Sequence, residues 1–378
     1  MKWPLMTNNI TRQDIICLTA FLNQPEIPRL TNGEQVRAFE AEFASWLGVR
    51  YAVMVNSGSS ANLITMQALK LLRGVERVLV PCITWVSDIA AVLQAGMTPV
   101  FVDVRPDTLG MNLDSAPRHG AVFLTHCLGF NAFNAGIIEQ NVIEDCCESI
   151  GGTAGRPKLG SVGLMSNFSF YYAHHMSTIE GGMVCTDDLA CYQLLRRLRS
   201  HGLVREMLPG GDRDAWADDN PTLDPQFIFA EPAYNVRPTE LNAVLGRSQL
   251  KRLDASVRAR TENLLALLNM LDGSRYRVNY RTEGSSNYAL PLILVEKDER
   301  LFGRVLDTLR ELGVEYRKGT AGGGNQLRQP YAKERWGADF HKEFPEAEHI
   351  SDFSVYVGNY PDLPKDNIYE LCERLNRL

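Results

Sequence analysis

Short apolar runs that alternate with helical stretches constrain the fold of this chain more than any other feature of its sequence. Runs typical of strands lie at Tyr51–Val55, Val78–Val80, Thr98–Val102 and Val122–Thr125, and Ile143–Asp145 ends another. Apolar residues at helical spacing fill stretches between them, such as 61–72 and 87–95, and 34–47 has the same spacing ahead of the first run. This alternation predicts an α/β fold with a mainly parallel sheet and helices on both faces.

The C-terminal third has a different pattern, and 378 residues are too many for one small core. A long helix is predicted over 250–271, followed by a strand-like run at 288–295 and a helix at 301–312. We therefore expect a large domain over 1–248 and a smaller α+β domain over 249–378. Residues 209–232 are rich in Asp, Pro and Gly and are predicted to form a long loop.

Composition excludes several classes of function. The net charge of -6 leaves no basic surplus to neutralise phosphates, which argues against a nucleic-acid partner or an anionic membrane surface. No apolar run is long enough for a membrane span, and no signal peptide is evident, so a cytoplasmic location is expected. The eight cysteines are scattered, without a C-x-x-C pair or a zinc-like spacing, and we expect free thiols and no metal site.

Three segments carry groups suited to a ligand. In the first, a strand leads through Ser57-Gly58-Ser59-Ser60 into a helix, where backbone N–H groups and hydroxyls could bind a phosphate. A plain turn with serine as the N-cap is the alternative. In the second, Asp145 ends a strand, where α/β folds place ligands, and could pair with a protonated pyridine nitrogen. An aspartate that caps the next helix would give the same sequence pattern, and this is the alternative interpretation.

The third segment, residues 167–184, is an aromatic strand followed by His174-His175, a polar turn and Glu180-Gly181-Gly182. A histidine at such a place is more often a hydrogen-bonded core residue than a catalyst. The three segments together, with Trp85 after a loop that contains Pro81, Gly160–Gly163 and Tyr234–Pro238, resemble the family named after DegT, DnrJ, EryC1 and StrS. The resemblance covers the chain from about residue 33 to its C-terminus.

This resemblance implies fold type I of the pyridoxal-phosphate enzymes, with a large mixed, mainly parallel sheet domain and a small C-terminal domain. Family members carry a cofactor-binding lysine six residues before the Glu-Gly-Gly motif, and here that position is His174. The nearest lysines, Lys158 and Lys251, lie too far along the chain to replace it. A subgroup with histidine at this place is similar to the 3-dehydratases of nucleotide-linked 4-keto-6-deoxy sugars, GDP-4-keto-6-deoxymannose among them.

Histidine in place of lysine changes the expected chemistry. Imidazole forms no stable imine, so pyridoxal or pyridoxamine 5'-phosphate would be held non-covalently, with His174 as the general base. The resemblance implies loss of the 3-hydroxyl and release of ammonia, giving a 3,6-dideoxy-4-keto sugar of the kind used in lipopolysaccharide O-antigen. L-glutamate would restore the amine form of the cofactor.

The family pattern also implies roles for other residues. Gly58, Ser59, Ser60 and Ser169 would hold the cofactor phosphate, and Trp85 would stack on the ring.

Asp145 would pair with the ring nitrogen, and Glu148, where relatives have glutamine, would approach the ring oxygen. Asn235 would reach the phosphate in the neighbouring subunit, which implies a homodimer with shared sites. Arg237 is a candidate for the glutamate carboxylate, and His201 is a further substrate candidate.

Other interpretations remain at this point. A related 3-dehydrase of CDP-4-keto-6-deoxyglucose carries an iron–sulfur cluster, but its C-x-C element is missing here. The chain could also be a catalytically inactive homologue kept as a scaffold, or an aminotransferase with another base. Sugar recognition is expected from the loops 209–232 and 319–329. The glycine run of the second loop could approach the sugar or form a flexible turn.

Overall fold

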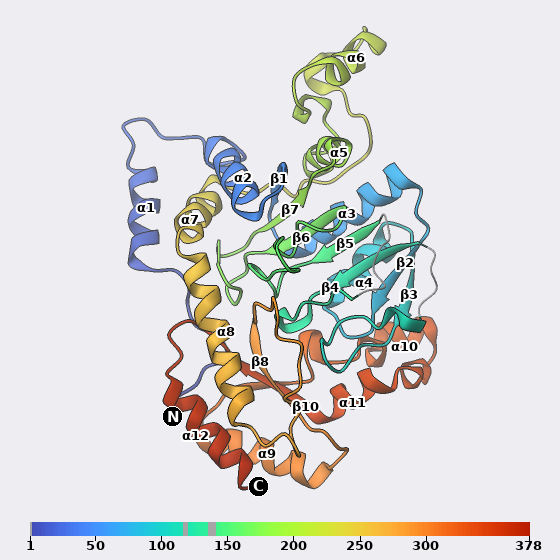
Figure 1. Cartoon of the computed structure of the whole chain (residues 1–378). Coiled ribbons are helices and arrows are strands. Elements are labelled where there is room, and N and C mark those ends of the chain that lie inside the picture. Colours follow the sequence, from blue (N-terminus) through green and yellow to red (C-terminus); the bar gives the residue numbers. More distant parts are fainter. Residues whose placement is uncertain (1, 116–119, 135–140) are drawn as a thin grey trace.

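The computed structural model describes residues 2–115, 120–134 and 141–378 (Figure 1). A seven-stranded sheet forms its centre, and the strands lie side by side in the order β1, β7, β6, β5, β4, β2, β3. Their bounds are β1 (Tyr51–Val55), β7 (Gly182–Thr186), β6 (Met165–Ser169), β5 (Val142–Asp145), β4 (Ala121–Thr125), β2 (Arg77–Pro81) and β3 (Thr98–Val102). Neighbouring strands from β6 to β3 run parallel, and β7 pairs antiparallel with both β6 and β1. The predicted mainly parallel α/β sheet is confirmed.

Helices cover both faces of this sheet because its strands are apolar on both sides. In β1, Val53 and Val55 pack in a cluster with α3 (Gly58–Arg73), α4 (Val86–Gln94) and α5 (Leu189–Arg199). The alternate residues Ala52 and Met54 pack with α2 (Glu34–Leu47) and α7 (Glu240–Leu250) in another cluster. This division follows from the two-residue period of a strand.

A second sheet of three antiparallel strands lies below the first in Figure 1. It is formed by β8 (Ala289–Ile293), β10 (Ser354–Gly358) and β9 (Tyr316–Lys318). Around it lie α8 (Leu253–Met270), α9 (Glu299–Leu312), α10 (Pro330–Trp336), α11 (Pro345–Phe353) and α12 (Lys365–Asn376). The predicted domain boundary at residue 249 remains a proposal. The N-terminal residue Trp3 packs in the apolar cluster of the second sheet, so the small domain also includes part of the N-terminal segment.

Three predicted elements were wrong in detail. The turn expected at 57–60 is the N-cap and first turn of α3, which begins at Gly58. The helix expected over 250–271 is present as α8, but it begins three residues later, at Leu253, because a separate helix, α7, ends at Leu250. The loop expected over 209–232 contains α6 (Gly211–Asp219), which buries none of its residues and so has no core-facing stripe in its sequence.

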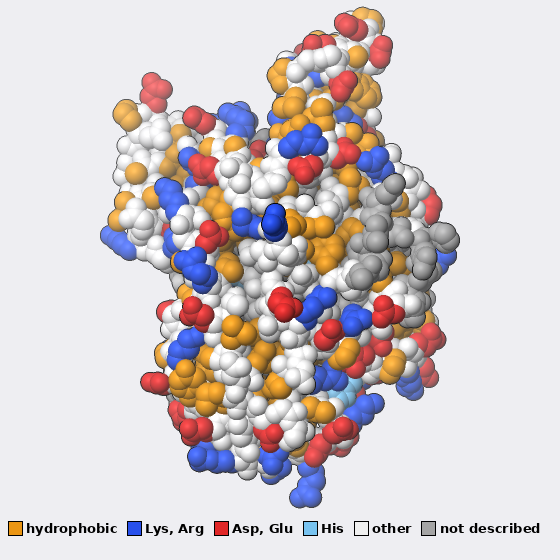
Figure 2. Space-filling view, in the orientation of Figure 1, with side chains coloured by type: hydrophobic (Ala, Val, Ile, Leu, Met, Phe, Trp, Pro, Cys, Tyr) orange, Lys and Arg blue, Asp and Glu red, His pale blue; other side chains and the backbone are white. Residues whose placement is uncertain are grey.

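The surface and the cysteines agree with the composition. On the face in Figure 2, basic and acidic side chains are interspersed, and α6 projects from the body with apolar and acidic groups. The cysteines form no disulfide within the described residues, and six of the eight are buried. Among the described residues, no helix is both long and apolar enough to cross a bilayer. α1 (Arg12–Leu22) packs beside α7.

Candidate active site

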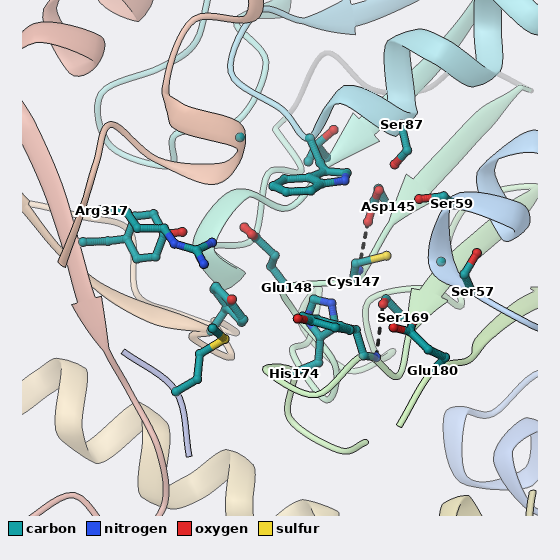
Figure 3. Close-up of a pocket in the computed structure, with 18 residues that line it drawn as sticks. Ser57, Ser59, Ser87, Asp145, Cys147, Glu148, Ser169, His174, Glu180 and Arg317 are labelled. Atoms are coloured by element: carbon teal, nitrogen blue, oxygen red, sulfur yellow. Dashed lines mark hydrogen bonds between the residues drawn. The ribbon is translucent and has the colours of Figure 1, made fainter. Parts of the chain in front are cut away.

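A cavity of about 270 Å³ lies at the carboxyl ends of β4, β5 and β6, where parallel sheets place their ligands (Figure 3). The second sheet closes it from the other side through β9 and β10. Its lining residues are Met6, Ser57, Gly58, Ser59, Trp85, Ser87, Thr125, Asp145, Cys147, Glu148, Ser169, Tyr171, His174, Glu180, Tyr288, Arg317, Gly322 and Tyr356.

Hydroxyl groups gather at the N-terminus of α3. Ser57 caps this helix, because its Oγ accepts a 3.0 Å hydrogen bond from Ser60 N. Gly58 lies so close to β6 that a Cβ on it would be 2.7 Å from Ser169 Cβ. Ser57, Ser59 and Ser169 therefore face the cavity around a helix end that favours anions. The N-cap interpretation of this segment is confirmed for Ser57, and phosphate binding by its neighbours stays a prediction.

Asp145, the last residue of β5, lies in the wall of the cavity and is 5 % exposed. Its Oδ1 accepts a 2.8 Å hydrogen bond from Cys147 N, and its Oδ2 lies 3.3 Å from Asn62 Nδ2. These contacts fix the carboxylate at the wall of the cavity (Figure 3). A cationic ring nitrogen would be a fitting partner.

His174 follows β6 and lies across the cavity from the serines, as Figure 3 shows. Burial lowers the pKa of its imidazole to about 4, and the charge of Arg260 acts in the same direction while that of Asp145 opposes it. The ring is therefore neutral at physiological pH and can accept a proton. Its Nδ1 is buried without a hydrogen-bond partner among the described residues.

The backbone of His174 is held from two sides. Its carbonyl oxygen accepts hydrogen bonds from Asn9 Nδ2 and, at 3.4 Å, from an Arg260 guanidinium nitrogen. The neighbouring His175 has a 3.0 Å contact between Nε2 and Ser286 Oγ and is absent from the cavity wall. The structure thus separates the two adjacent histidines into one that faces the cavity and one that is hydrogen-bonded in the core.

Two further residues predicted to contact the cofactor, Glu148 and Trp85, also line the cavity. Glu148 Oε2 accepts a 2.6 Å hydrogen bond from Leu128 N, and burial raises the pKa of this carboxyl to about 7. Trp85 precedes α4 and is 49 % exposed although it lines the cavity. A flat ligand ring could cover this indole.

Four of the predicted residues lie outside the cavity wall. Ser60 is engaged with Ser57 at the helix start. Asn235 is exposed and its Oδ1 accepts a 3.0 Å hydrogen bond from Arg237 Nε. His201 is exposed, with a left-handed backbone φ of 65°. Their functional roles stay predictions.

No sequence pattern indicated the residues that the second sheet contributes to the cavity. Arg317 on β9 and Tyr356 on β10 hydrogen-bond through their side chains and, with Tyr288, face the cavity opposite the serines. Gly322 lines the cavity within the loop 319–329 that was expected near the sugar. Arg317 comes from a three-residue strand, too short to show a pattern.

Three potential metal ligands, His126, Glu144 and Cys146, also lie close together in the core. The Glu144 carboxylate already accepts hydrogen bonds from Gly160 N, Val162 N and Gly163 N, and lies 3.3 Å from His126 Nε2. Its oxygens are thus occupied within the chain, so this cluster ties the loop before β6 to β5.

Comparison with known proteins now adds to this geometry. Residues 18–376 match the profile of the DegT/DnrJ/EryC1/StrS aminotransferase family. The chain belongs to this family. Similar proteins include two named GDP-4-keto-6-deoxy-D-mannose 3-dehydratase. The one from Yersinia pseudotuberculosis is 33 % identical over 87 % of this chain and 88 % of its own length. The one from Escherichia coli O55:H7 is 31 % identical over 87 % and 89 %.

A solved structure shares the fold over almost the whole chain. It is a GDP-4-keto-6-deoxymannose-3-dehydratase with a trapped PLP-glutamate geminal diamine. It superposes with a TM-score of 0.89 and 29 % identity and covers 99 % of this chain and 100 % of its own. The predicted fold of the pyridoxal-phosphate sugar aminotransferases is confirmed.

Proposed function

We propose that this member of the family is a 3-dehydratase that uses pyridoxamine and pyridoxal 5'-phosphate on a nucleotide-linked 4-keto-6-deoxy sugar. One observation carries the proposal: His174, rather than a lysine, faces Asp145 across the cavity, and no lysine is among the described residues that line it. A neutral imidazole can move protons but cannot hold the cofactor covalently.

The residues of the cavity fit the cofactor. The hydroxyls of Ser57, Ser59 and Ser169 at the start of α3 suit its phosphate, and glycine at position 58 allows the helix start to pack directly against Ser169. Asp145 suits the protonated ring nitrogen, and Glu148 suits the ring oxygen. When bound, the cofactor supplies an amine that condenses with the 4-keto group and a ring that accepts an electron pair.

His174 performs the proton transfers in this proposal. With the cofactor bound, the neutral ring of His174 would accept a proton at the carbon beside the amine and return it to the 3-hydroxyl of the sugar, which would leave as water. Asp145 would hold the proton on the ring nitrogen, so that the ring could accept electrons. The products would be ammonia and the 3-deoxy-4-keto sugar, and L-glutamate would supply the amine and leave as the 2-keto acid. L-glutamate thereby supplies the two electrons for the reductive loss of the 3-hydroxyl group from the sugar.

We take GDP-4-keto-6-deoxymannose as the first substrate to test, because relatives at 33 % and 31 % identity are named for it. Arg317 at the cavity wall is a cation that would hold an anionic part of the substrate or of glutamate. A role in dideoxysugar and O-antigen synthesis and a cytoplasmic location belong to the same proposal.

A homodimer is the second part of the proposal. Asn235 and Arg237 are outside the cavity wall of their own chain, and in this proposal they act on the site of the partner subunit. The projecting segment around α6 exposes Leu223, Phe227 and Phe229, which a second subunit would cover. Mixing His174→Ala and Asn235→Ala subunits tests this, because a mixed dimer holds one intact site only if Asn235 acts across the interface. Turnover in the mixture supports shared sites, and its absence contradicts them.

The function is tested by incubation with the cofactor, L-glutamate and a panel of GDP-, CDP- and dTDP-linked 4-keto-6-deoxy sugars. We expect a product lighter than the substrate by one oxygen atom, with one ammonia per product. A 4-amino sugar would instead identify an aminotransferase. No product and no cofactor binding would identify an inactive scaffold, and stoichiometric iron in the purified protein would favour the cluster-containing 3-dehydrases.

A further inference from the structure

Asp88, in the first turn of α4, is a completely buried acid next to the cavity. No lysine, arginine or histidine among the described residues forms an ion pair with it. An unpaired buried carboxylate would be costly, so the group must be neutral or share its charge.

Its neighbours form a closed hydrogen-bond network. Thr84 Oγ1 and, at 2.7 Å, Thr125 Oγ1 contact Asp88 Oδ2, while Asn62 Nδ2 lies 2.7 Å from Asp88 Oδ1. The same Asn62 nitrogen lies 3.3 Å from Asp145 Oδ2. The side chains of Asp88 and Asp145 are themselves within hydrogen-bonding reach. The carboxyl groups of Asp88 and Asp145 are therefore neighbours at the wall of the cavity.

Two like charges this close do not both persist in a buried site. Burial first, and then the negative charge of Asp145, raises the pKa of Asp88 well above its usual range. The thiol of Cys147 faces both acids, and burial and Asp145 also raise its pKa. The charge of Asp145 acts in addition on Cys146, Glu148 and the neutral imidazole of His174. No neighbouring group therefore supplies positive charge to Asp88.

Geometry decides which of the two acids keeps the charge. Asp145 accepts the backbone N–H of Cys147 and borders the cavity, where a cationic ring can pair with it. Asp88 is closed off from the cavity by Thr84, Thr125 and Asn62 and has access to no cation. The proton accordingly belongs on Asp88 and the charge on Asp145.

We propose that Asp88 is a positioning residue of the cofactor site: a neutral carboxylic acid that donates its O–H to Asp145. The pair then presents one negative charge to one protonated ring nitrogen. The donated hydrogen bond also fixes the Asp145 carboxylate and makes it a poorer acceptor for the ring proton, so that the proton stays on the ring. This inference rests on the proposed function for the identity of the ring.

Infrared spectroscopy of the cofactor-free protein tests the proton directly. We expect the carbonyl-stretch band of a protonated carboxylic acid at pH 9, where Glu148, with a pKa of about 7, is ionised. The band should vanish in Asp88→Asn and persist in Asp114→Asn, a control at an acid that is 72 % exposed. A band that is absent from the parent protein, or that survives in Asp88→Asn, would overturn the proposal. This result does not depend on catalysis, so the proposed function can fail separately.

Cofactor binding tests the positioning role. In Asp88→Asn the new amide keeps an N–H for Asp145, and Asn62 Oδ1, which has no partner among the described residues, can accept the other. We expect pyridoxamine phosphate affinity within about twofold of the parent. Asp88→Ala removes the donor and should weaken binding roughly tenfold. An equal loss of cofactor affinity in both variants would show that a charge at Asp88 is needed. An unchanged affinity in both would show that Asp88 does not act through Asp145.

Discussion

The two walls of the cavity differ in how the fold positions their residues. On the cofactor side, Asp145, Ser169 and the serines of α3 lie at strand ends or a helix start and are held by backbone hydrogen bonds or close packing. On the substrate side, Arg317 extends from the short edge strand β9 and is exposed. The residues of the cofactor side are held in place and suit a single ligand, the cofactor. Residues of the substrate side can be replaced with little effect on the fold.

This difference predicts that substitutions will separate cofactor binding from substrate binding. Changes on the cofactor side should alter cofactor affinity or chemistry, and changes on the substrate side should alter KM. Substitutions at five positions test this separation.

The largest effect is expected at His174, which borders both walls. His174→Ala removes the only proposed base, and turnover should fall by about a thousandfold or more. Cofactor affinity should change little, since the phosphate and ring nitrogen keep their partners. Single-turnover assays with pre-bound pyridoxamine phosphate measure the turnover rate, and equilibrium titration measures the cofactor affinity. Normal turnover would remove His174 from the mechanism.

Asp145→Ala should weaken cofactor binding by roughly ten- to a hundredfold, because a charge-assisted hydrogen bond to the ring is lost. Turnover at saturating cofactor should also fall, since the ring nitrogen loses its partner. Titration of the apoprotein measures the affinity. An unchanged affinity would place the ring elsewhere in the cavity.

Arg317→Ala should raise the KM for the sugar nucleotide or for glutamate by about tenfold and leave cofactor affinity unchanged. Arg317→Lys keeps the charge without the two-pronged geometry and should recover part of the loss. Steady-state kinetics with each substrate varied in turn identifies which one Arg317 holds. A loss of cofactor affinity in Arg317→Ala would contradict the separation of the two walls.

Gly58→Ala brings a methyl group against Ser169, at a distance that real Cβ atoms do not tolerate. The backbone of α3 must shift, at a cost of about 1–3 kcal/mol in the free energy of unfolding. Cofactor phosphate binding should weaken with it. Thermal unfolding and cofactor titration of this variant, beside Gly303→Ala, where a Cβ meets nothing within 4 Å, separate the local effect from a general one.

The smallest effect concerns Glu148 and pH. Burial raises its pKa to about 7, and its protonated form can donate to the ring oxygen. Binding therefore takes up a proton above pH 7, so affinity should fall as pH rises, by at most about tenfold per pH unit. Below pH 7 the affinity should level off. Glu148→Gln should flatten this dependence, and a parent profile that is already flat between pH 6 and 9 would contradict the assignment.

The cofactor wall could be predicted from the sequence, and the substrate wall could not. Parallel strands bring their carboxyl ends to one edge, so motifs after β5 and β6 and at the start of α3 had to meet. The position of Arg317 depends on how the second sheet packs on the first, which no local pattern encodes. The same holds for Asp88, which the sequence placed only within a helix at 87–95. Its contact with Asp145 arises because β2, β4 and β5 are neighbours in the sheet.

Non-covalent binding of the cofactor, on which the role of His174 depends, can be tested by borohydride reduction of the protein loaded with pyridoxal phosphate. Reduction fixes an imine as a stable bond, so intact-mass measurement shows whether any side chain holds the cofactor. We predict that the parent chain keeps its unmodified mass, while His174→Lys, as a positive control, gains the mass of one cofactor. A cofactor adduct on a lysine of the parent chain would contradict the account.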